Sequence, residues 1–529
     1  MCLHFTYMHI HFMHMSVFHP DERRLVKAVS RLSLANPFLP ERIEAEREAL
    51  GAEFQERPFV WSILADEPDE PPNVDRIGRL AESLAEQVRS RLLRSPRPVS
   101  EEDRTLYEDV VLYALYHRFR NPLRKLTEKA ETAREALPAP FFPDFLAGAR
   151  HFSSVPGMRP IDAAEAAHVF ACAFQIRRAF HHIFLRIVGG SMPAARLRAS
   201  AWQSIFTHDM RRYRRTLYAG MSEITTLITG PSGTGKDLVA SSIALSRYLP
   251  FDPRALAFPE GLADAFLALN LPALSPTLIE SELFGHRRGA FTGALADRAG
   301  FLEICRPLGT VFLDEIGEVD PAIQVKLLRV LETRVFHRIG DTETRRFHGK
   351  LVAATNRNLS REMAAGRFRA DLYYRICSDI IETPSLSSQL ASDPGELRNF
   401  LLVLTRRIAG AEAEAVAAEV EDWIREHLGA DYPWPGNVRE LEQCVRNVLV
   451  RKEYRPETPA DADPEEIFLR AARRGELTAE AMLSRYCTLV FARAGSYAEA
   501  ARRLGLDRRS VKAKVDPEWL EALRAWGHS

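Results

Sequence analysis

Hydrophobic and polar positions follow two different patterns along most of the chain. From residue 15 to about 195, apolar residues recur at helical spacing; "SEEDRTLYEDVVLYALYHRF" (100–119) opens with a serine cap and an acidic first turn. From about residue 220, short apolar runs alternate with helical patterns: "ITTLITG" (224–230), "TVFLDE" (310–315) and "GKLVAATN" (349–356). Continuous apolar runs are typical of parallel strands covered on both faces. The pattern predicts a doubly wound α/β sheet after an all-α region, with a site at the carboxyl ends of the strands.

The last quarter of the chain is predicted to be helical again. Residues 395–454 are predicted to be helical, with a break at "YPWPGN" (432–437). A linker rich in Pro, Asp and Glu (455–475) leads to a basic helical tail (476–529). At the other end, residues 1–14 lack the basic start and cleavage site of a signal peptide and are interpreted as a non-native or disordered start.

Composition narrows the functional classes. The 71 basic and 71 acidic side chains cancel, so no global field attracts nucleic acid and any basic surface must be local. The longest apolar run (163–190) contains three arginines and is too charged to span a membrane. The six scattered cysteines form no Cys-x-x-Cys pair, which is typical of reduced thiols. We expect a cytoplasmic protein that has no membrane partner.

The segment "GPSGTGKD" (230–237) has the order of a phosphate-binding loop, because a strand pattern precedes it and a helical pattern follows. Its glycines let backbone N–H groups surround a phosphate, while Lys236 reaches the β- and γ-oxygens and the helix dipole adds attraction. Asp237 stands where Ser or Thr usually contacts Mg²⁺. The predicted nucleotide-binding residues are Gly230, Pro231, Ser232, Gly233, Thr234, Gly235, Lys236 and Asp237.

Two further strand ends supply chemistry for nucleotide hydrolysis. In "VFLDE", Asp314 is predicted to hold Mg²⁺, and Glu315 to orient and deprotonate the attacking water. In "ATNRNL", Asn356 is suited to sense a γ-phosphate. The predicted cofactors are therefore ATP and Mg²⁺, and the predicted activity is ATP hydrolysis.

Arg369 and Arg375 in "FRADLYYR" are six residues apart, which is about 240° of rotation on a helix. One bound phosphate is therefore not expected to take both from the same face. They either complete the site of a neighbouring subunit or are surface charges, and the pattern alone leaves both interpretations open.

The tail contains "SYAEAARRLGLDRRSVKAKV" (496–515), which predicts helix, glycine turn and helix, with Gly505 at the turn and Asp507 as the cap of the second helix. The basic stripe of that helix suits the major groove of DNA, although short basic helical pairs are common. The predicted DNA-binding residues are Arg508, Arg509 and Lys512.

Taken together, these motifs resemble those of the AAA+ activators of sigma-54 RNA polymerase, the bacterial enhancer-binding proteins. The resemblance covers about residues 195–450 and rests on "LIESELFGHRRGAFTGA", "FLDEIGE", "QVKLLRVLE", "ATNRNL", "FRADLYYRI" and "YPWPGNVRELE", in family order. It implies an AAA+ α/β subdomain at 196–394 and a lid at 395–454. The tail resembles the Fis-type helix-turn-helix that ends such activators.

The resemblance also implies roles for individual residues. Asn270 would restrain Glu315 until the γ-phosphate is engaged, Arg369 and Arg375 would act on the neighbouring subunit's nucleotide, and Arg439 would be a second nucleotide sensor. Sigma-54 would be contacted by Gly289, Ala290, Phe291, Thr292, Gly293 and Ala294. Family members form rings, usually hexamers, and a helical region such as 15–195 would regulate the ring.

Four departures from the family pattern stand out. Pro231 replaces the usual Glu, Leu271 replaces a frequent Cys, and the segment between "SRYLPF" and Asn270 is longer than usual. Family members have an arginine-rich stretch after the positions of Arg369 and Arg375. In this chain "PSLSSQ" (384–389) stands there, a difference that bears on how the lid is attached.

Three functions are consistent with the sequence. The leading hypothesis is an activator that binds DNA upstream of promoters and hydrolyses ATP to open the closed complex of the sigma-54 RNA polymerase holoenzyme. The alternatives are an AAA+ remodeller of another macromolecule, and a DNA-binding regulator that uses ATP only for assembly.

Overall fold

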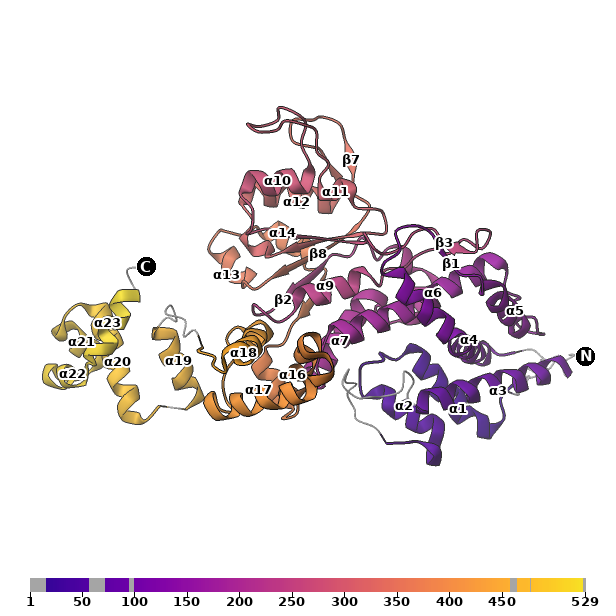
Figure 1. Cartoon of the computed structure of the whole chain (residues 1–529), viewed down its shortest axis with the longest axis horizontal. Coiled ribbons are helices and arrows are strands. Elements are labelled where there is room, and N and C mark those ends of the chain that lie inside the picture. The colour runs from indigo at the N-terminus through magenta and orange to yellow at the C-terminus, as the bar shows by residue number, and fades with distance from the viewer. Residues whose placement is uncertain (1–15, 57–71, 95–98, 457–463, 476, 527–529) are drawn as a thin grey trace, which may run out of the picture. The chain divides into compact units, whose positions relative to one another are not determined.

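The computed structural model describes residues 16–56, 72–94, 99–456, 464–475 and 477–526 (Figure 1). The predicted start segment, residues 1–14, lies outside them. The chain forms two compact units, residues 1–450 and 451–529. No helix in the described ranges is both long enough and apolar enough to cross a membrane.

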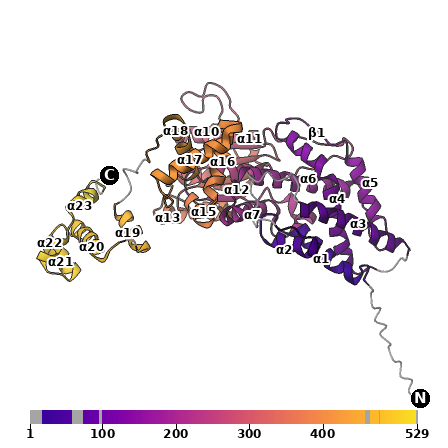
Figure 2. The same ribbon diagram turned by 60° about the horizontal axis from the view of Figure 1, so that its bottom comes forward.

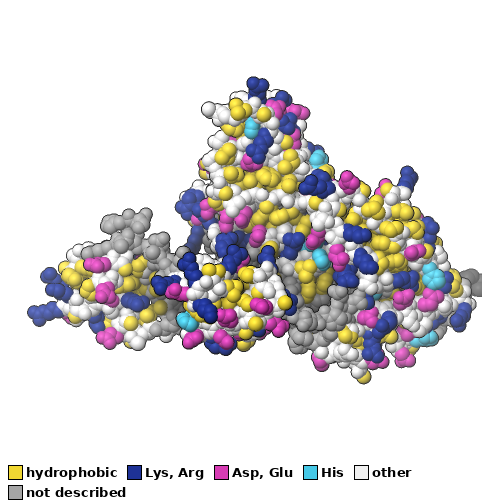
Figure 3. Space-filling view, viewed as in Figure 1, with side chains coloured by type: hydrophobic (Ala, Val, Ile, Leu, Met, Phe, Trp, Pro, Cys, Tyr) yellow, Lys and Arg dark blue, Asp and Glu magenta, His cyan; other side chains and the backbone are white. Residues whose placement is uncertain are grey.

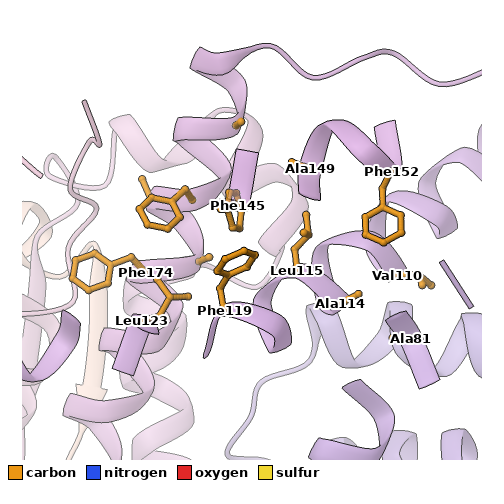
Figure 4. Packing of buried hydrophobic residues seen from close by; sticks show 14 of the residues in the cluster. Ala81, Val110, Ala114, Leu115, Phe119, Leu123, Phe145, Ala149, Phe152 and Phe174 are labelled. Carbon is orange, nitrogen blue, oxygen red and sulfur yellow. The ribbon is translucent and has the colours of Figure 1, made fainter. Parts of the chain in front are cut away.

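The first unit begins with the predicted helical region. Ser100 caps the longest helix by accepting a hydrogen bond from the backbone N–H of Asp103 at 3.1 Å. The core between these helices is rich in aromatic rings, among them Phe119, Phe145 and Phe174 (Figure 4). The elements are α1 (Pro20–Leu34), α2 (Glu41–Leu50), η1 (Gly51–Glu53), α3 (Pro72–Arg94), α4 (Glu101–Ala130), β1 (Leu137–Pro138), α5 (Phe142–Ser153) and α6 (Ala163–Arg186).

This helical core does not end at the boundary of the α/β region. The long segment before Asn270 folds back onto it, and its strand β3 (Ala257–Phe258) pairs with β1 in antiparallel register. Phe251 and Phe258 are buried, with ring centroids 4.8 and 5.9 Å from that of Phe170. The unusual length of this segment therefore builds a shared core between the helical region and the α/β region.

The α/β region contains a five-stranded parallel sheet in the order β4-β5-β8-β2-β9. The prediction of a parallel sheet flanked by helices is confirmed. Its strands are β2 (Thr226–Thr229), β4 (Phe266–Asn270), β5 (Thr310–Asp314), β8 (Lys350–Thr355) and β9 (Asp379–Glu382).

The apolar runs of these strands are continuous because both faces are covered (Figure 1). Ile228, Phe312 and Val352 join a cluster with α7 (Met192–Phe206) and α9 (Lys236–Ala244). Their neighbours Leu227, Leu313 and Leu351 point to the opposite face and pack with α10, α12 and α14. The remaining elements of the α/β region are α8 (Met210–Arg215), η2 (Leu217–Ala219), α10 (Pro276–Phe284), α11 (Phe301–Ile304), η3 (Ile316–Glu318), α12 (Pro321–Thr333), β6 (Val335–Phe336), β7 (Arg345–Arg346), α13 (Leu359–Ala364) and α14 (Ala370–Ile376).

The boundary expected after residue 195 falls inside α7, which packs against the sheet. Helices α16 (Glu396–Ala409), α17 (Ala413–His427) and α18 (Asn437–Arg451), with η4 (Gly410–Glu412), lie in the predicted lid region, and α15 (Leu386–Ser392) precedes it (Figure 2). The "PSLSSQ" stretch starts α15, where Ser385 accepts a hydrogen bond from the backbone N–H of Ser388.

The second unit is entirely helical in its described residues. The predicted helix, glycine turn and helix are present: Gly505 has φ +65°, and Asp507 accepts hydrogen bonds from the N–H groups of Arg509 and Ser510 at 2.9 Å. The elements are α19 (Pro464–Arg474), α20 (Ala479–Ala494), α21 (Tyr497–Leu504), α22 (Arg508–Lys514) and α23 (Pro517–Trp526). Helix α19 lies inside the segment expected to be a linker.

Candidate nucleotide site

The loop between β2 and α9 has the backbone of a phosphate cradle. Gly230, Gly233 and Gly235 have φ values of +142°, +76° and +81°, a region that side chains disfavour. A Cβ on Gly230 would lie 2.1 Å from Thr383 Oγ1, and one on Gly233 would lie 2.3 Å from the carbonyl oxygen of Gly436. Both conformation and space therefore require glycine, and the loop keeps its N–H groups accessible for an anion.

Lys236 lies inside the curve of this loop. Its side chain is only 7% exposed, and Nζ donates to the carbonyl oxygens of Gly230 at 3.1 Å and Pro231 at 3.2 Å. Nζ also lies 3.8 Å from Oε1 of Glu315. The cation thus stands between the phosphate loop and the acidic strand end, as the sequence predicts for a lysine that binds β- and γ-phosphates.

Asp314 and Glu315 end strand β5 at the same edge of the sheet. Glu315 has a left-handed backbone with φ +55°, a conformation that costs about 1–3 kcal/mol in a residue other than glycine. Its N–H donates to Oδ1 of Asp314 at 3.1 Å. Burial, and secondarily the charge of Glu315, raise the pKa of the Asp314 carboxyl. Such strain and crowding of like charge are typical of functional sites.

The two asparagines predicted as sensors flank this acidic pair. Asn270 ends β4 and is the register partner of Asp314. Oε2 of Glu315 accepts a hydrogen bond of 2.9 Å from the backbone N–H of Asn356. Glu315 therefore contacts Asn356 and Lys236 in this conformation, and its restraint by Asn270 stays a prediction.

The lid is attached to the phosphate loop by Asn437, a residue that sequence reasoning missed. Its side chain is buried, with Nδ2 donating to the Ser232 carbonyl at 2.9 Å and Oδ1 accepting from the Leu386 N–H at 2.8 Å. The predicted second sensor, Arg439, donates to Ser232 Oγ at 3.3 Å. Asn437 thus joins three segments, including the divergent "PSLSSQ" stretch. The only sequence signal was a polar residue at the start of a helix.

Arg369 and Arg375 have partners outside the phosphate loop. Arg369 forms a two-pronged ion pair with Asp371, with N···O distances of 3.0 and 2.6 Å. Arg375 donates to the Leu331 carbonyl oxygen at 3.2 and 3.3 Å. Within the described ranges, neither guanidinium forms an ion pair or hydrogen bond with the phosphate loop of its own chain.

The segment Gly289–Ala294 forms the tip of a loop between α10 and α11. Gly289 and Gly293 have φ values of +80° and +102°, with open space around both. The Gly289 N–H donates to the Ala294 carbonyl at 2.8 Å, which closes the turn. Phe291 is half-buried, and its ring centroid lies 5.0 Å from that of His286. The tip is thus a compact turn.

Sequence reasoning missed Leu295, the residue that follows this turn. Its side chain is 86% exposed, more than any other large apolar side chain in the described ranges. The sequence gives no sign of this exposure, because a leucine is ordinarily a core residue.

The base of this loop is braced by a second loop. The backbone of His286 forms β-bridges with that of Arg298 and that of Ile339. In addition, Arg287 Nε lies 3.2 Å from Asp341 Oδ2. Both loops extend away from the sheet beside β7 (Figures 1 and 2). Backbone bridges and an ion pair at the base therefore support the projecting tip.

In the second unit, Arg508, Arg509 and Lys512 are exposed on α22. None of them has a carboxylate partner within 4.0 Å among the residues that the structure describes, whereas Arg502 and Arg503 on α21 both pair with Glu499. Lys and Arg side chains gather at the end of this unit formed by α21 and α22 (Figure 3).

Residues 206–382 match the family described as the sigma-54 interaction domain. The chain is 44% identical over 229 residues to the Nif-specific regulatory protein of Azotobacter vinelandii, covering 43% of this chain and 40% of that protein. It is 38% identical over 300 residues to the transcriptional regulatory protein ZraR of Salmonella typhimurium, covering 56% of this chain and 63% of that protein. A crystal structure of NtrX from Brucella abortus in complex with ATP is 23% identical, covers 72% of this chain and 80% of that chain, and gives a TM-score of 0.38.

The chain thus spans 40–63% of the length of these two curated relatives. The matched region contains the phosphate loop, the acidic pair, both asparagines, both arginines and the projecting loop. The predicted resemblance to sigma-54-dependent activators and the predicted AAA+ fold class are confirmed.

Proposed function

We propose that this chain, which contains a sigma-54 interaction domain and is homologous to sigma-54-dependent activators, is an ATP-driven transcriptional activator. It would bind DNA upstream of promoters, assemble into a ring and remodel the closed complex of sigma-54 RNA polymerase. The proposal rests on one observation above all. The candidate nucleotide site that contains Lys236, Asp314 and Glu315 lies in the same α/β region as the projecting, braced loop Gly289–Ala294.

The residues present fit ATP and Mg²⁺. The loop has a backbone that only glycine adopts without strain at Gly230 and Gly233, and Lys236 Nζ lies against its carbonyl oxygens. Asp314 would hold Mg²⁺, which supplies charge stabilisation when bound. Glu315 would orient the attacking water and accept its proton. Arg439, attached to the phosphate loop from the lid, would complete the nucleotide pocket.

Assembly into a ring is supported by the positions of Arg369 and Arg375. Both are held away from the phosphate loop of their own chain, by Asp371 and by the end of α12. An arginine that stabilises developing phosphate charge must reach the nucleotide, so these two would serve the neighbouring subunit's site. A hexamer is the expected ring.

The end of strand β5, where hydrolysis would take place, is connected to the projecting loop through a short part of the chain. The N–H of Leu271 donates to the carbonyl of Asp314 at 3.3 Å, and the chain from Leu271 leads into α10 and then the loop tip. A shift of the β5 end on nucleotide hydrolysis would move α10, and with it the tip that contacts sigma-54.

DNA binding is supported by the unpaired cations of α22. Arg508, Arg509 and Lys512 would contact base edges or phosphates in the major groove, since helix-turn-helix units present their second helix to DNA. Protein that has lost these three charges is expected to bind DNA more weakly at every sequence, because phosphate contacts dominate affinity.

The experiment that tests this function is Glu315→Gln in paired assays of ATP hydrolysis and promoter opening. The variant keeps the shape of the side chain but loses the base, so hydrolysis is expected to fall by roughly 100-fold or more. Opening of a sigma-54 promoter is expected to fall in parallel. Full opening without hydrolysis would favour the alternative in which ATP serves only assembly. Normal hydrolysis would remove Glu315 from the chemistry.

A further inference from the structure

A cavity of about 270 Å³ lies inside the first unit, remote in sequence from the phosphate loop. Its walls come from α1 to α8, and include Leu115 and Phe145 of the aromatic core (Figure 4). An engineered apolar cavity of about 150 Å³ is large enough to bind benzene. The cavity of this protein can therefore hold a larger organic molecule.

Ring side chains dominate one side of the cavity. Tyr113, Tyr116, Phe180 and Trp202 line it, and the ring centroids of Tyr113 and Tyr116 lie 4.3 and 5.4 Å from that of His117. Burial raises the pKa of both tyrosines, so their hydroxyls stay neutral. Flat aromatic surfaces of this kind pack well against a flat apolar ligand.

The charged side chains that line the cavity are mostly positive. They are five arginines and two acids: Arg42, Arg120, Arg177, Arg211, Arg214, Glu46 and Asp109. Three of the arginines have carboxylate partners, since Arg42 pairs with Glu46, Arg120 with Asp75 and Arg211 with Asp109.

Arg177 and Arg214 have no carboxylate within 4.0 Å among the described residues. Nε of Arg177 and Nδ1 of His117 are also buried without a hydrogen-bond partner in the described ranges. Burial lowers the pKa of His117 to about 3, so this imidazole is neutral and can donate or accept a hydrogen bond. Because uncompensated charge beside an apolar cavity is costly, the site favours an anionic guest.

We propose that this cavity binds an organic carboxylate with a flat apolar body. The ring system would pack among Tyr113, Tyr116 and Trp202, and the carboxylate would pair with Arg177. No residue of the phosphate loop takes part, so this is a second ligand site.

Helix α6 connects this second site to the nucleotide site. Next to Arg177, the fully buried Arg178 donates to the carbonyl oxygens of Leu245 and Arg247, just beyond α9. Gln175 on the same helix donates to the Ser246 carbonyl at 2.9 Å. Helix α9 begins at Lys236, so a ligand that shifts α6 would shift the helix that carries the phosphate-binding lysine. Control of ATPase activity by the ligand is the one part that rests on the proposed function.

The binding test is calorimetry on the full chain with two probes, 2-naphthoate and the uncharged 2-naphthamide. We expect one site that binds 2-naphthoate roughly tenfold or more tightly than 2-naphthamide, because hydrogen bonds to charged groups are the stronger ones. Arg177→Gln should remove this preference. Arg196→Gln, an exposed arginine on α7 outside the cavity, should keep it. Absence of binding, equal binding of the two probes, or a preference that survives Arg177→Gln would overturn the proposal.

A second variant tests the proposal independently of any local folding defect in Arg177→Gln. Val169→Phe fills the cavity from α6 and should abolish binding of both probes, with thermal unfolding as the check that the chain still folds. Retained binding would place the probes elsewhere and overturn the proposal. In an ATPase assay, saturating 2-naphthoate should change the rate about fivefold or more in the unsubstituted chain and in Arg196→Gln, but not in Arg177→Gln. Binding without any change in rate would overturn the coupling, while the Glu315→Gln assays judge the proposed function separately.

Discussion

At the scale of single residues, the nucleotide site concentrates unfavourable features. Glu315 has a left-handed backbone, Asp314 carries a carboxylate beside a second one, and Lys236 is almost fully buried. Each feature costs stability in the absence of nucleotide, and each is explained if the site is arranged for phosphate and Mg²⁺. The residues that carry the proposed chemistry are therefore expected to be stability liabilities.

The carboxyl of Asp314 gives a prediction with a defined pH dependence. Because its pKa is raised in the folded chain, ionisation costs stability above that pKa, and the cost vanishes below the ordinary aspartate pKa of about 4. Asp314→Asn should therefore raise Tm at pH 7 by roughly 2–4 °C without nucleotide, while it abolishes Mg²⁺-dependent hydrolysis. The gain in Tm should disappear as the pH falls toward 4.

Thermal unfolding between pH 4 and pH 8 checks this prediction. Asp422→Asn is the matched control, because that carboxylate is exposed on α17 and its substitution should leave Tm unchanged at each pH. A loss of stability in Asp314→Asn at neutral pH would contradict the account of this site.

At the scale of elements, a buried amide is one of the contacts that join the lid to the phosphate loop. Asn437 bonds both the Ser232 carbonyl and the Leu386 N–H, so α15, α18 and the phosphate loop meet at this side chain. The family's arginine-rich stretch is absent here, yet the lid is attached. A change of nucleotide at the loop would thus be transmitted to two lid helices through Asn437.

Asn437→Ala should weaken nucleotide binding by roughly tenfold. The substitution leaves a buried N–H and a buried carbonyl without partners, each at a cost of about 1–3 kcal/mol, and removes the buried contact between the lid and the loop. Calorimetric titration with ADP measures the effect. Asn447→Ala on the same helix is the control, since that amide contacts only the Gln443 carbonyl near the surface. Equal affinities in the two variants would contradict a role for Asn437 in coupling the lid.

The elements also show how much of the fold and of the candidate site could be predicted from the sequence. The strands of the sheet, the phosphate loop and the acidic strand end were predictable, because the apolar run or motif that marks each one lies within a few positions of the chain. The buried contacts of Asn437 were not, since its partners Ser232 and Leu386 lie far away along the chain. The cavity beside α6 could not be predicted for the same reason. Apolar spacing predicts that a helix has a buried face, but it does not show where the packing of several helices leaves a space.

At the scale of the whole molecule, the proposed activity requires more than one chain. Among the described residues, Arg369 and Arg375 bond Asp371 and the Leu331 carbonyl and not the phosphate loop of their own chain. The site is complete only if a neighbour contributes one, and the first unit would then act as a repeating part of a ring.

Mixing two inactive variants tests this dependence on a neighbour. Glu315→Gln retains its arginines but lacks the base, and Arg375→Ala retains the base but lacks the arginine. If Arg375 acts on the neighbouring site, some interfaces in mixed rings pair an intact arginine with an intact Glu315, and ATPase activity should reappear. Arg361→Ala, a nearby exposed arginine on α13, should be active by itself. Inactivity at every mixing ratio would contradict action between subunits.

The most direct test of the central claim separates ATP hydrolysis from binding to sigma-54. Thr292 lies at the tip of the projecting loop, outside the nucleotide site. We predict that Thr292→Ala retains ATPase activity but loses binding to sigma-54 in the presence of ADP–aluminium fluoride, and with it promoter opening. Unchanged sigma-54 binding by the Thr292→Ala variant would contradict the account.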